Sequence, residues 1–130
     1  ARYLGVEYRQ PTAFPMNALG PSRAFYWLDA KDPARARQLA HALYRAYFVD
    51  DVDISIADNT IAVAVKMGLD AEAVRAGMSD AAVKDRTRAE VDKAIAKGVF
   101  GSPYIIVDGE PFWGSDRLDQ VDKWLATGGW

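Results

Sequence analysis

The amino-acid sequence predicts an α/β fold in which an all-helical region is inserted between strands. Apolar residues recur at helical spacing through the middle of the chain, from about residue 32 to residue 97. Strand signals flank this region, with residues 6–9 before it and the β-branched and aromatic run Tyr104–Val107 after it. At 130 residues and 50% apolar composition, the chain is long enough to build one compact core and no second.

The first part of the chain predicts a helix end, a strand and an irregular stretch. Residues 1–4 are typical of a last helical turn with Gly5 beyond it, since glycine commonly closes helices. A strand at residues 6–9 follows. Residues 11–21 contain several prolines and Gly20, which argue against regular structure there.

Five helices are expected between this stretch and the strand run. Asp32, Asp70 and Ser79 are the side chains expected to begin three of them. The expected bounds are residues 21–28, 32–48, 55–67, 70–78 and 79–97. Two of the helices carry apolar stripes typical of a core face. The stripes are Leu39, Leu43, Ala46 and Tyr47 in one helix and Val83, Thr87, Val91, Ala94 and Ile95 in the other.

Composition excludes several function classes. The net charge is −2 and no basic stripe is present, so nucleic acid is not an expected partner. No run approaches the roughly 20 apolar residues that span a bilayer, so no membrane contact is expected. The chain has no cysteine, which excludes disulfides, thiolate chemistry and cysteine metal sites within these residues. The lone His41 has no clustered partner, which favours a structural role on or near a helix surface.

The acidic run Asp50-Asp51-Val52-Asp53 invites a calcium interpretation. It lacks the full spacing, the glycine and the terminal glutamate of an EF-hand loop. A solvated turn between helices is therefore the favoured interpretation, and no metal site is predicted.

Residues 98–117 combine the features of a binding site. Pro103 stands at the entry to Tyr104–Val107, a continuous run expected of a strand buried on both faces. A cis Ser102–Pro103 bond would leave the backbone N–H and C=O of Ser102 facing an extended ligand, and a trans bond at a plain strand start is the open alternative. Asp108-Gly109 then predicts a two-residue hairpin turn, with Glu110–Trp113 returning as an edge strand.

A final amphipathic helix is expected to begin at about Ser115. The unpaired N–H groups at its start would suit a ligand carboxylate, and Asp116 could hold a ligand ammonium. On local grounds an ordinary capping role for Ser115 and a first-turn role for Asp116 stay open. The apolar face of this helix would be Leu118, Val121, Trp124 and Leu125.

These features together resemble the C-terminal end of the DsbA-like branch of the thioredoxin superfamily. The resemblance rests on residues 98–103, the strand, Asp108-Gly109 and residues 112–118, with weaker support from residues 50–55 and 14–17. Within the branch, the chain looks most like 2-hydroxychromene-2-carboxylate isomerase and the kappa-class glutathione transferase. The resemblance implies a thioredoxin-like, DsbA-type fold. Residues 1–18 and 98–130 would form a partial thioredoxin-like domain, and residues 19–97 an inserted helical domain.

Members of this family begin with a strand and a helix whose junction carries the reactive group. That group is a serine in the isomerases and kappa transferases and a Cys-x-x-Cys pair in the oxidoreductases. The sequence shows neither feature, so we expect it to be the latter part of a longer protein. The catalytic residue is accordingly unknown.

The resemblance implies a glutathione-dependent isomerase or transferase that acts on a small electrophilic substrate, such as one from aromatic catabolism. The cysteinyl backbone of glutathione would pair with Ser102 beside Pro103. The γ-glutamyl end would reach the turn formed by Gly114, Ser115, Asp116 and Arg117. The bound thiol would add reversibly to a conjugated substrate and allow bond rotation before it leaves.

Two residues have alternative interpretations. Asn17 is a candidate for holding glutathione or the substrate carboxylate, and a turn stabilised by its own side chain is the alternative. Arg117 matches the Asp-Arg pair of the family, or it is a solvent-facing arginine. The resemblance further implies a homodimer in the cytoplasm.

Two rival functions remain. A DsbA-like thiol–disulfide oxidoreductase shares the proline loop and the helical insertion, and an upstream Cys-x-x-Cys would establish it. Residues 112–117 favour the glutathione enzyme instead. The second rival is a non-catalytic binding or assembly module that uses the remaining fold for association.

Overall fold

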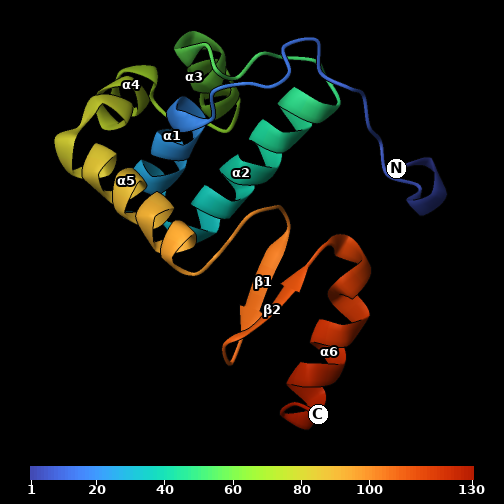
Figure 1. Cartoon of the computed structure of the whole chain (residues 1–130). Helices are drawn as coiled ribbons and strands as arrows, with labels where there is room; N and C mark the ends of the chain where they lie inside the picture. Colours follow the sequence, from blue (N-terminus) through green and yellow to red (C-terminus); the bar gives the residue numbers. More distant parts are fainter. The chain divides into compact units, whose positions relative to one another are not determined.

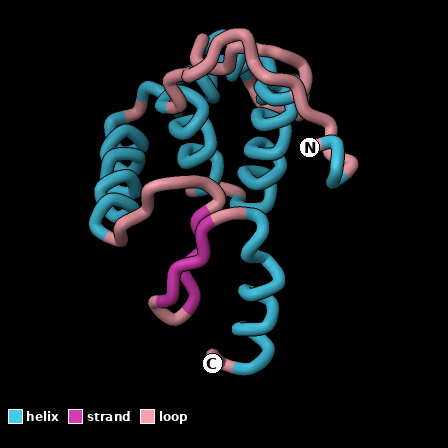
Figure 2. Tube along the Cα trace, turned by 45° about the vertical axis from the view of Figure 1, so that its right-hand side comes forward, coloured by secondary structure: helices cyan, strands magenta, loops and turns pink.

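The computed structural model describes all residues from Ala1 to Trp130, and the chain divides into two compact units, Ala1–Ala89 and Glu90–Trp130. Figures 1 and 2 show the course of the chain. The helices are α1 (Leu19–Asp29), α2 (Pro33–Phe48), α3 (Ala57–Lys66), α4 (Ala71–Ser79), α5 (Ala81–Ala96) and α6 (Leu118–Thr127). The strands are β1 (Tyr104–Val107) and β2 (Glu110–Trp113), and two 3-10 turns are η1 (Arg2–Leu4) and η2 (Ser115–Arg117). None of the helices is long and apolar enough to cross a membrane.

The first unit is built around α1, which contacts α2, α3 and α4 (Figure 1). The hydrophobic core cluster of the chain lies wholly within this unit. All four residues of the stripe predicted on α2 are buried, and His41 on the same helix is exposed. The buried members of the cluster are Ala24, Leu28, Ala36, Leu39, Leu43, Ala46, Tyr47, Ile54, Ile61, Val63, Ala64, Val74 and Met78.

Side-chain caps fix two of the helix starts where the sequence predicts them. The Asp32 carboxylate accepts from the Arg35 N–H at 3.0 Å, and the Asp70 carboxylate accepts from the Ala73 N–H at 2.8 Å. These bonds satisfy N–H groups that have no partner inside the helix. Ser79 was expected to begin α5, which is wrong, because Ser79 ends α4 and Asp80 accepts from the Val83 N–H at 3.0 Å.

One further expectation is wrong, and two are confirmed only in part. The expected strand at residues 6–9 is wrong, since this segment has no regular structure and the sheet consists of β1 and β2. Helix α1 begins at Leu19, with Pro21 in the first turn, where its missing N–H costs no hydrogen bond. On α5, Thr87 is buried but Val91 is 48% and Ile95 68% exposed, so the predicted stripe is a core face only near its start.

The turn between α2 and α3 anchors the segment that precedes α1. Asp51, at a φ of 58°, accepts from both the N–H and the hydroxyl of Thr12 at 2.7 Å, and its carboxylate lies 3.0 Å from Arg9. The two Thr12 bonds, with the Arg9 charge, hold the pKa of Asp51 below its usual value. The predicted turn is present, but Asp51 is bonded to a distant segment instead of being solvated.

The second unit packs a β-hairpin against α6. The strands are antiparallel, with Tyr104 opposite Trp113 and Val107 opposite Glu110. Asp108 and Gly109 both have positive φ, 52° and 89°, as the predicted two-residue turn requires. Helix α6 contacts both strands (Figure 2).

The core of this second unit is small. Phe112 is 4% exposed, and its ring meets the rings of Trp124 and Trp130 edge to face. Val121 is the buried residue of α6, whereas Leu118 and Leu125 of the predicted apolar face are exposed. No residue of β1 is fully buried, so the expected burial on both faces is wrong. A two-stranded sheet has no third strand to enclose β1.

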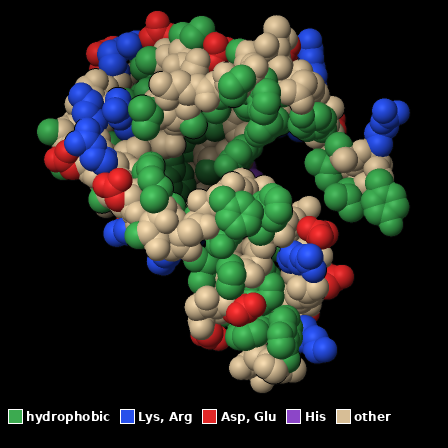
Figure 3. Space-filling model, in the orientation of Figure 1, with side chains coloured by type: hydrophobic (Ala, Val, Ile, Leu, Met, Phe, Trp, Pro, Cys, Tyr) green, Lys and Arg blue, Asp and Glu red, His purple; other side chains and the backbone are tan.

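Acidic and basic side chains are interspersed on the visible face of the molecule (Figure 3). This mixing agrees with the small net charge and gives no continuous basic stripe on that face.

Because α1 and α4 are in close contact, we predict that Gly77 on α4 does not tolerate a larger residue. A Cβ at Gly77 would overlap the inner atoms of the Trp27 indole, which the Lys31 ammonium covers at 4.3 Å from the ring centroid. We expect Gly77→Ala to lower the free energy of unfolding by about 1–3 kcal/mol, measured by urea denaturation. Gly20→Ala is the matched control, since its Cβ would make only ordinary contacts at 3.6 Å or more. Equal stability of the two variants would contradict this packing.

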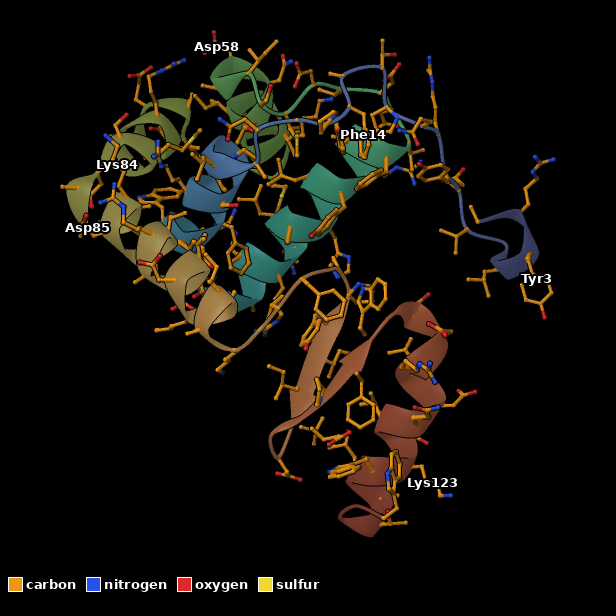
Figure 4. All side chains as sticks on the ribbon, in the orientation of Figure 1. Tyr3, Phe14, Asp58, Lys84, Asp85 and Lys123 are labelled. Carbon is orange, nitrogen blue, oxygen red and sulfur yellow. The ribbon has the colours of Figure 1, made fainter.

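The lowered pKa of Asp51 predicts a pH-dependent stability difference. The unfolded carboxyl titrates at about 3.9, so the ionised form stabilises the fold above that pH, and the contribution is lost as pH falls through the lower folded-state pKa. Asp51→Asn should therefore be less stable than wild type at neutral pH, with the gap narrowing below about pH 4. Asp85→Asn on α5, labelled in Figure 4, is the exposed charge-matched control. A pH-independent gap would contradict this assignment.

Candidate functional site

The loop before β1 and the turn after β2 lie side by side within the second unit. The Gly114 N–H donates to the Pro103 carbonyl at 3.0 Å, directly beyond the Tyr104 and Trp113 pair. This bond extends the hairpin ladder by one step. Ser102 and Pro103 are thereby brought close to the predicted Gly114–Arg117 turn, as the sequence indicates.

Ser102 offers an unpaired stretch of backbone. The residue is exposed, and neither its N–H nor its carbonyl has a hydrogen-bond partner in the chain. The Ser102–Pro103 peptide bond, which the sequence leaves open between two isomers, is cis, as is Phe14–Pro15. Because both backbone groups of Ser102 are unpaired, an extended ligand could pair with them as an added strand pairs with a sheet edge.

Aromatic rings pack against each other and against this loop. The Phe100 ring meets Tyr104 and Trp113 edge to face, with centroid separations of 5.3 and 4.9 Å. Gly101 lies against the Trp113 indole so closely that a Cβ there would overlap the ring. Sequence reasoning does not identify Phe100, Gly101 or Trp113 as site residues. The small residue beside an aromatic-rich hairpin is the signal that could have indicated them.

The turn after β2 differs from the expected helix start. Residues Ser115–Arg117 form a 3-10 turn, and α6 begins only at Leu118. Gly114 has a φ of 109°, and its carbonyl accepts from the Arg117 N–H at 3.2 Å. This tighter bond replaces the first α-helical turn, and Ser115 makes no capping bond. The expectations of an α-helix from Ser115 and of a Ser115 cap are therefore wrong.

Polar groups of this turn are available to a ligand. The Asp116 carboxylate folds over Gly114 and lies 3.7 Å from the Arg117 Nε, with side-chain exposures of 78% and 49%. An ion pair this exposed contributes about 1 kcal/mol or less, so it is easily exchanged for a ligand contact. The backbone N–H groups of Ser115 and Asp116 have no partner in the chain. The turn can thus accept an ammonium at Asp116 and donate to a carboxylate.

Asn17 belongs to the first unit. Its side-chain oxygen accepts from the Leu19 N–H at 3.0 Å, which supports the start of α1. The turn-stabilising interpretation is therefore observed. The amide nitrogen of Asn17 makes no hydrogen bond to the chain, so a ligand role remains a prediction.

An apolar cavity of about 340 Å³ lies in the first unit between α1 and α2. Tyr47 lines it, and the Tyr47 hydroxyl donates to the Ala13 carbonyl at 2.7 Å. Burial raises the pKa of Tyr47, with a smaller contribution from the Asp53 charge. Other lining residues are Met16, Pro21, Phe25, Leu43 and Ile54. No group of three or more His, Cys, Asp or Glu side chains is arranged to hold a metal ion.

Comparisons with known proteins agree on the family of the chain. The family model of the DSBA-like thioredoxin domain matches residues 1–126. A 2-hydroxychromene-2-carboxylate isomerase of Sphingobium xenophagum is 29% identical over 92% of this chain and 62% of its own length. The kappa 2 glutathione S-transferase of Caenorhabditis elegans is 28% identical over 97% of this chain and 61% of its own length.

One solved structure is similar to this chain in fold. A structure from Nitrosomonas europaea, provisionally described as a protein disulfide isomerase, superposes with a TM-score of 0.79 at 18% identity, covering 98% of this chain and 69% of that one. The predicted DsbA-type, thioredoxin-like fold is thereby confirmed. The chain spans about three fifths of the length of the curated relatives it matches.

The contact between Gly101 and Trp113 predicts a local response to substitution. Gly101→Ala should displace the indole, because the new Cβ and the ring cannot occupy the same space. We expect one indole N–H signal to move in the ¹H–¹⁵N NMR spectrum, with a loss of about 1–3 kcal/mol in stability. Ser102→Ala, which keeps the backbone and adds no bulk, should leave that signal in place. An unmoved Trp113 signal in Gly101→Ala would show that the packing is not as described.

Proposed function

We propose that this chain, which belongs to the DSBA-like thioredoxin domain family, forms the glutathione-binding part of a glutathione-dependent isomerase. Its substrate class would be a small conjugated electrophile, such as an intermediate of aromatic catabolism. The names of the curated relatives, isomerases and a kappa-class glutathione transferase, support this choice. The observation that carries the proposal is the unpaired backbone of Ser102 beside the Gly114–Asp116 turn.

In this proposal the ligand lies beside Ser102, in the loop that precedes β1. The cysteinyl N–H and C=O of glutathione pair with the free C=O and N–H of Ser102, as in β-strand addition. Pro103 cannot donate a hydrogen bond, and its carbonyl already accepts from Gly114. Of Ser102 and Pro103, only Ser102 has both backbone groups free, so the proposal places the pairing there.

The γ-glutamyl end of glutathione carries an ammonium and a carboxylate, and the turn offers a partner for each. The exposed Asp116 carboxylate takes the ammonium in place of its long contact with Arg117. The carboxylate accepts from the free N–H groups of Ser115 and Asp116. Charged hydrogen bonds of this kind are worth about 1.5–3 kcal/mol each, enough to orient a small peptide.

The chemistry would reside in the bound thiol. None of the 130 residues is a cysteine, so the thiol in this proposal belongs to glutathione. Reversible addition of that thiol to a conjugated double bond makes the bond a single one, about which the substrate can rotate before the thiol leaves. The residues described here would bind and orient glutathione, and none of them is assigned the activation of its sulfur.

Calorimetric titration of glutathione into the purified protein tests this proposal. We expect saturable binding in wild type and a loss of about tenfold or more in affinity for Asp116→Ala, since a charged contact is removed. Asp122→Ala, an exposed acidic residue of α6, is the matched control and should bind as wild type does.

A second pair of variants tests the backbone contact. Ser102→Pro removes the N–H and should abolish binding, whereas Ser102→Ala removes only the hydroxyl and should bind normally. Absence of any heat at millimolar glutathione, or normal binding by both Ser102→Pro and Asp116→Ala, would refute the site.

A further inference from the structure

We propose that a cleft at the joined ends of α1, α3 and α4 binds the oxyanion of a small organic acid, with Arg23 as its principal contact. The cleft has a volume of about 350 Å³ and lies wholly within the first unit. Its polar lining consists of Asn17, Arg23, Ser55, Arg75 and Ser79. This inference stands independently of the proposed glutathione site.

The Nε–H group of Arg23 has no hydrogen-bond acceptor in the chain. Its Nε is buried and has no hydrogen-bond partner, and the side chain makes no ion pair with the chain. A buried, charged N–H without an acceptor is unfavourable, so such groups in proteins are almost always paired. An oxyanion in the cleft would supply the counter-charge that the Arg23 guanidinium lacks in the chain.

Arg75 provides a second guanidinium at the edge of the same cleft. Its Nη2 lies 2.9 Å from the carboxylate of Asp58 on α3, and its Nε lies 3.8 Å from Glu72. Asp58, labelled in Figure 4, and Glu72 are not part of the cleft lining. These acidic residues therefore hold Arg75 in place from outside, and no carboxylate within the cleft competes for an anion.

Backbone and hydroxyl donors complete the arrangement. Helices α1 and α3 both begin at the cleft, where Gly20 and Ala57 present first-turn N–H groups that have no partner in the chain. Helix starts carry partial positive charge and favour anions. The Ser79 hydroxyl and the Asn17 amide nitrogen are also unpaired. The only side-chain oxygen of Asn17 is already taken by Leu19, so the cleft mainly offers donors.

The apolar residues of the lining indicate what kind of group would carry the oxyanion. Leu19, Ile61 and Met78 provide apolar surface beside the polar groups. A cleft of this size accommodates a small molecule rather than a peptide or a nucleotide chain. The chemistry that fits is one oxyanion, a carboxylate or a phosphate, attached to a compact apolar body.

Three probes separate the sources of the oxyanion. Benzoate, inorganic phosphate and neutral benzamide are titrated into the chain at low ionic strength, and the side-chain Nε–H signal of Arg23 is followed by ¹⁵N NMR. Loss of that signal in Arg23→Met assigns it. We expect a saturable shift with benzoate or phosphate, the tighter binder identifying the source, and at least about tenfold weaker binding of benzamide.

Matched variants test whether Arg23 is responsible. Arg23→Met removes the guanidinium but keeps an unbranched apolar stem, and it should weaken anion binding by about tenfold or more. Arg37→Met on α2 removes the same charge from an exposed position outside the cleft and should bind as wild type does. Far-ultraviolet circular dichroism confirms that both variants are folded.

Two outcomes would overturn the proposal. The first is an Arg23 signal that does not move with either anion at about 10 mM, well above the range of specific binding. The second is equal anion affinity in wild type and Arg23→Met, which would mean that the anion binds through general surface charge.

Discussion

The hydrogen bond from the Gly114 N–H to the Pro103 carbonyl is the constraint on which the candidate site depends. It forms only because the two-residue Asp108-Gly109 turn sets the register that puts Tyr104 opposite Trp113. That register brings the loop before β1 next to the turn after β2. A shift of one residue would turn the side chains of one strand to the other face relative to its partner and break the pairing of Pro103 with Gly114.

The sequence predicts features that are decided locally. Asp32 and Asp70 each accept from an N–H three residues ahead, so their capping roles are visible in short segments of sequence. The positive φ angles of Asp108 and Gly109 are likewise a local preference. Ser79 shows the limit of this reasoning, because the neighbouring Asp80 caps α5 and a pattern of single residues cannot rank the two.

Features that depend on distant partners could not be predicted. The bond between Asp51 and Thr12 joins residues far apart in sequence, and nothing in the acidic run indicates it. The free backbone of Ser102 is expected from the sequence only for one isomer of the Ser102–Pro103 bond, which the sequence leaves open. The 3-10 turn at Ser115–Arg117 is not expected from the sequence, because it follows from the conformation of Gly114. The unpaired Nε of Arg23 could not be predicted either, because it depends on how the ends of α1, α3 and α4 pack in the fold.

The central claim is that the Ser102 backbone pairs with glutathione. Amide hydrogen exchange of the Ser102 N–H, followed by NMR with and without saturating glutathione, tests it most directly. The account predicts that exchange at Ser102 slows by about tenfold or more when glutathione binds, because a hydrogen-bonded amide exchanges only when it opens. Unchanged exchange at Ser102 in a protein that is saturated with glutathione would contradict it.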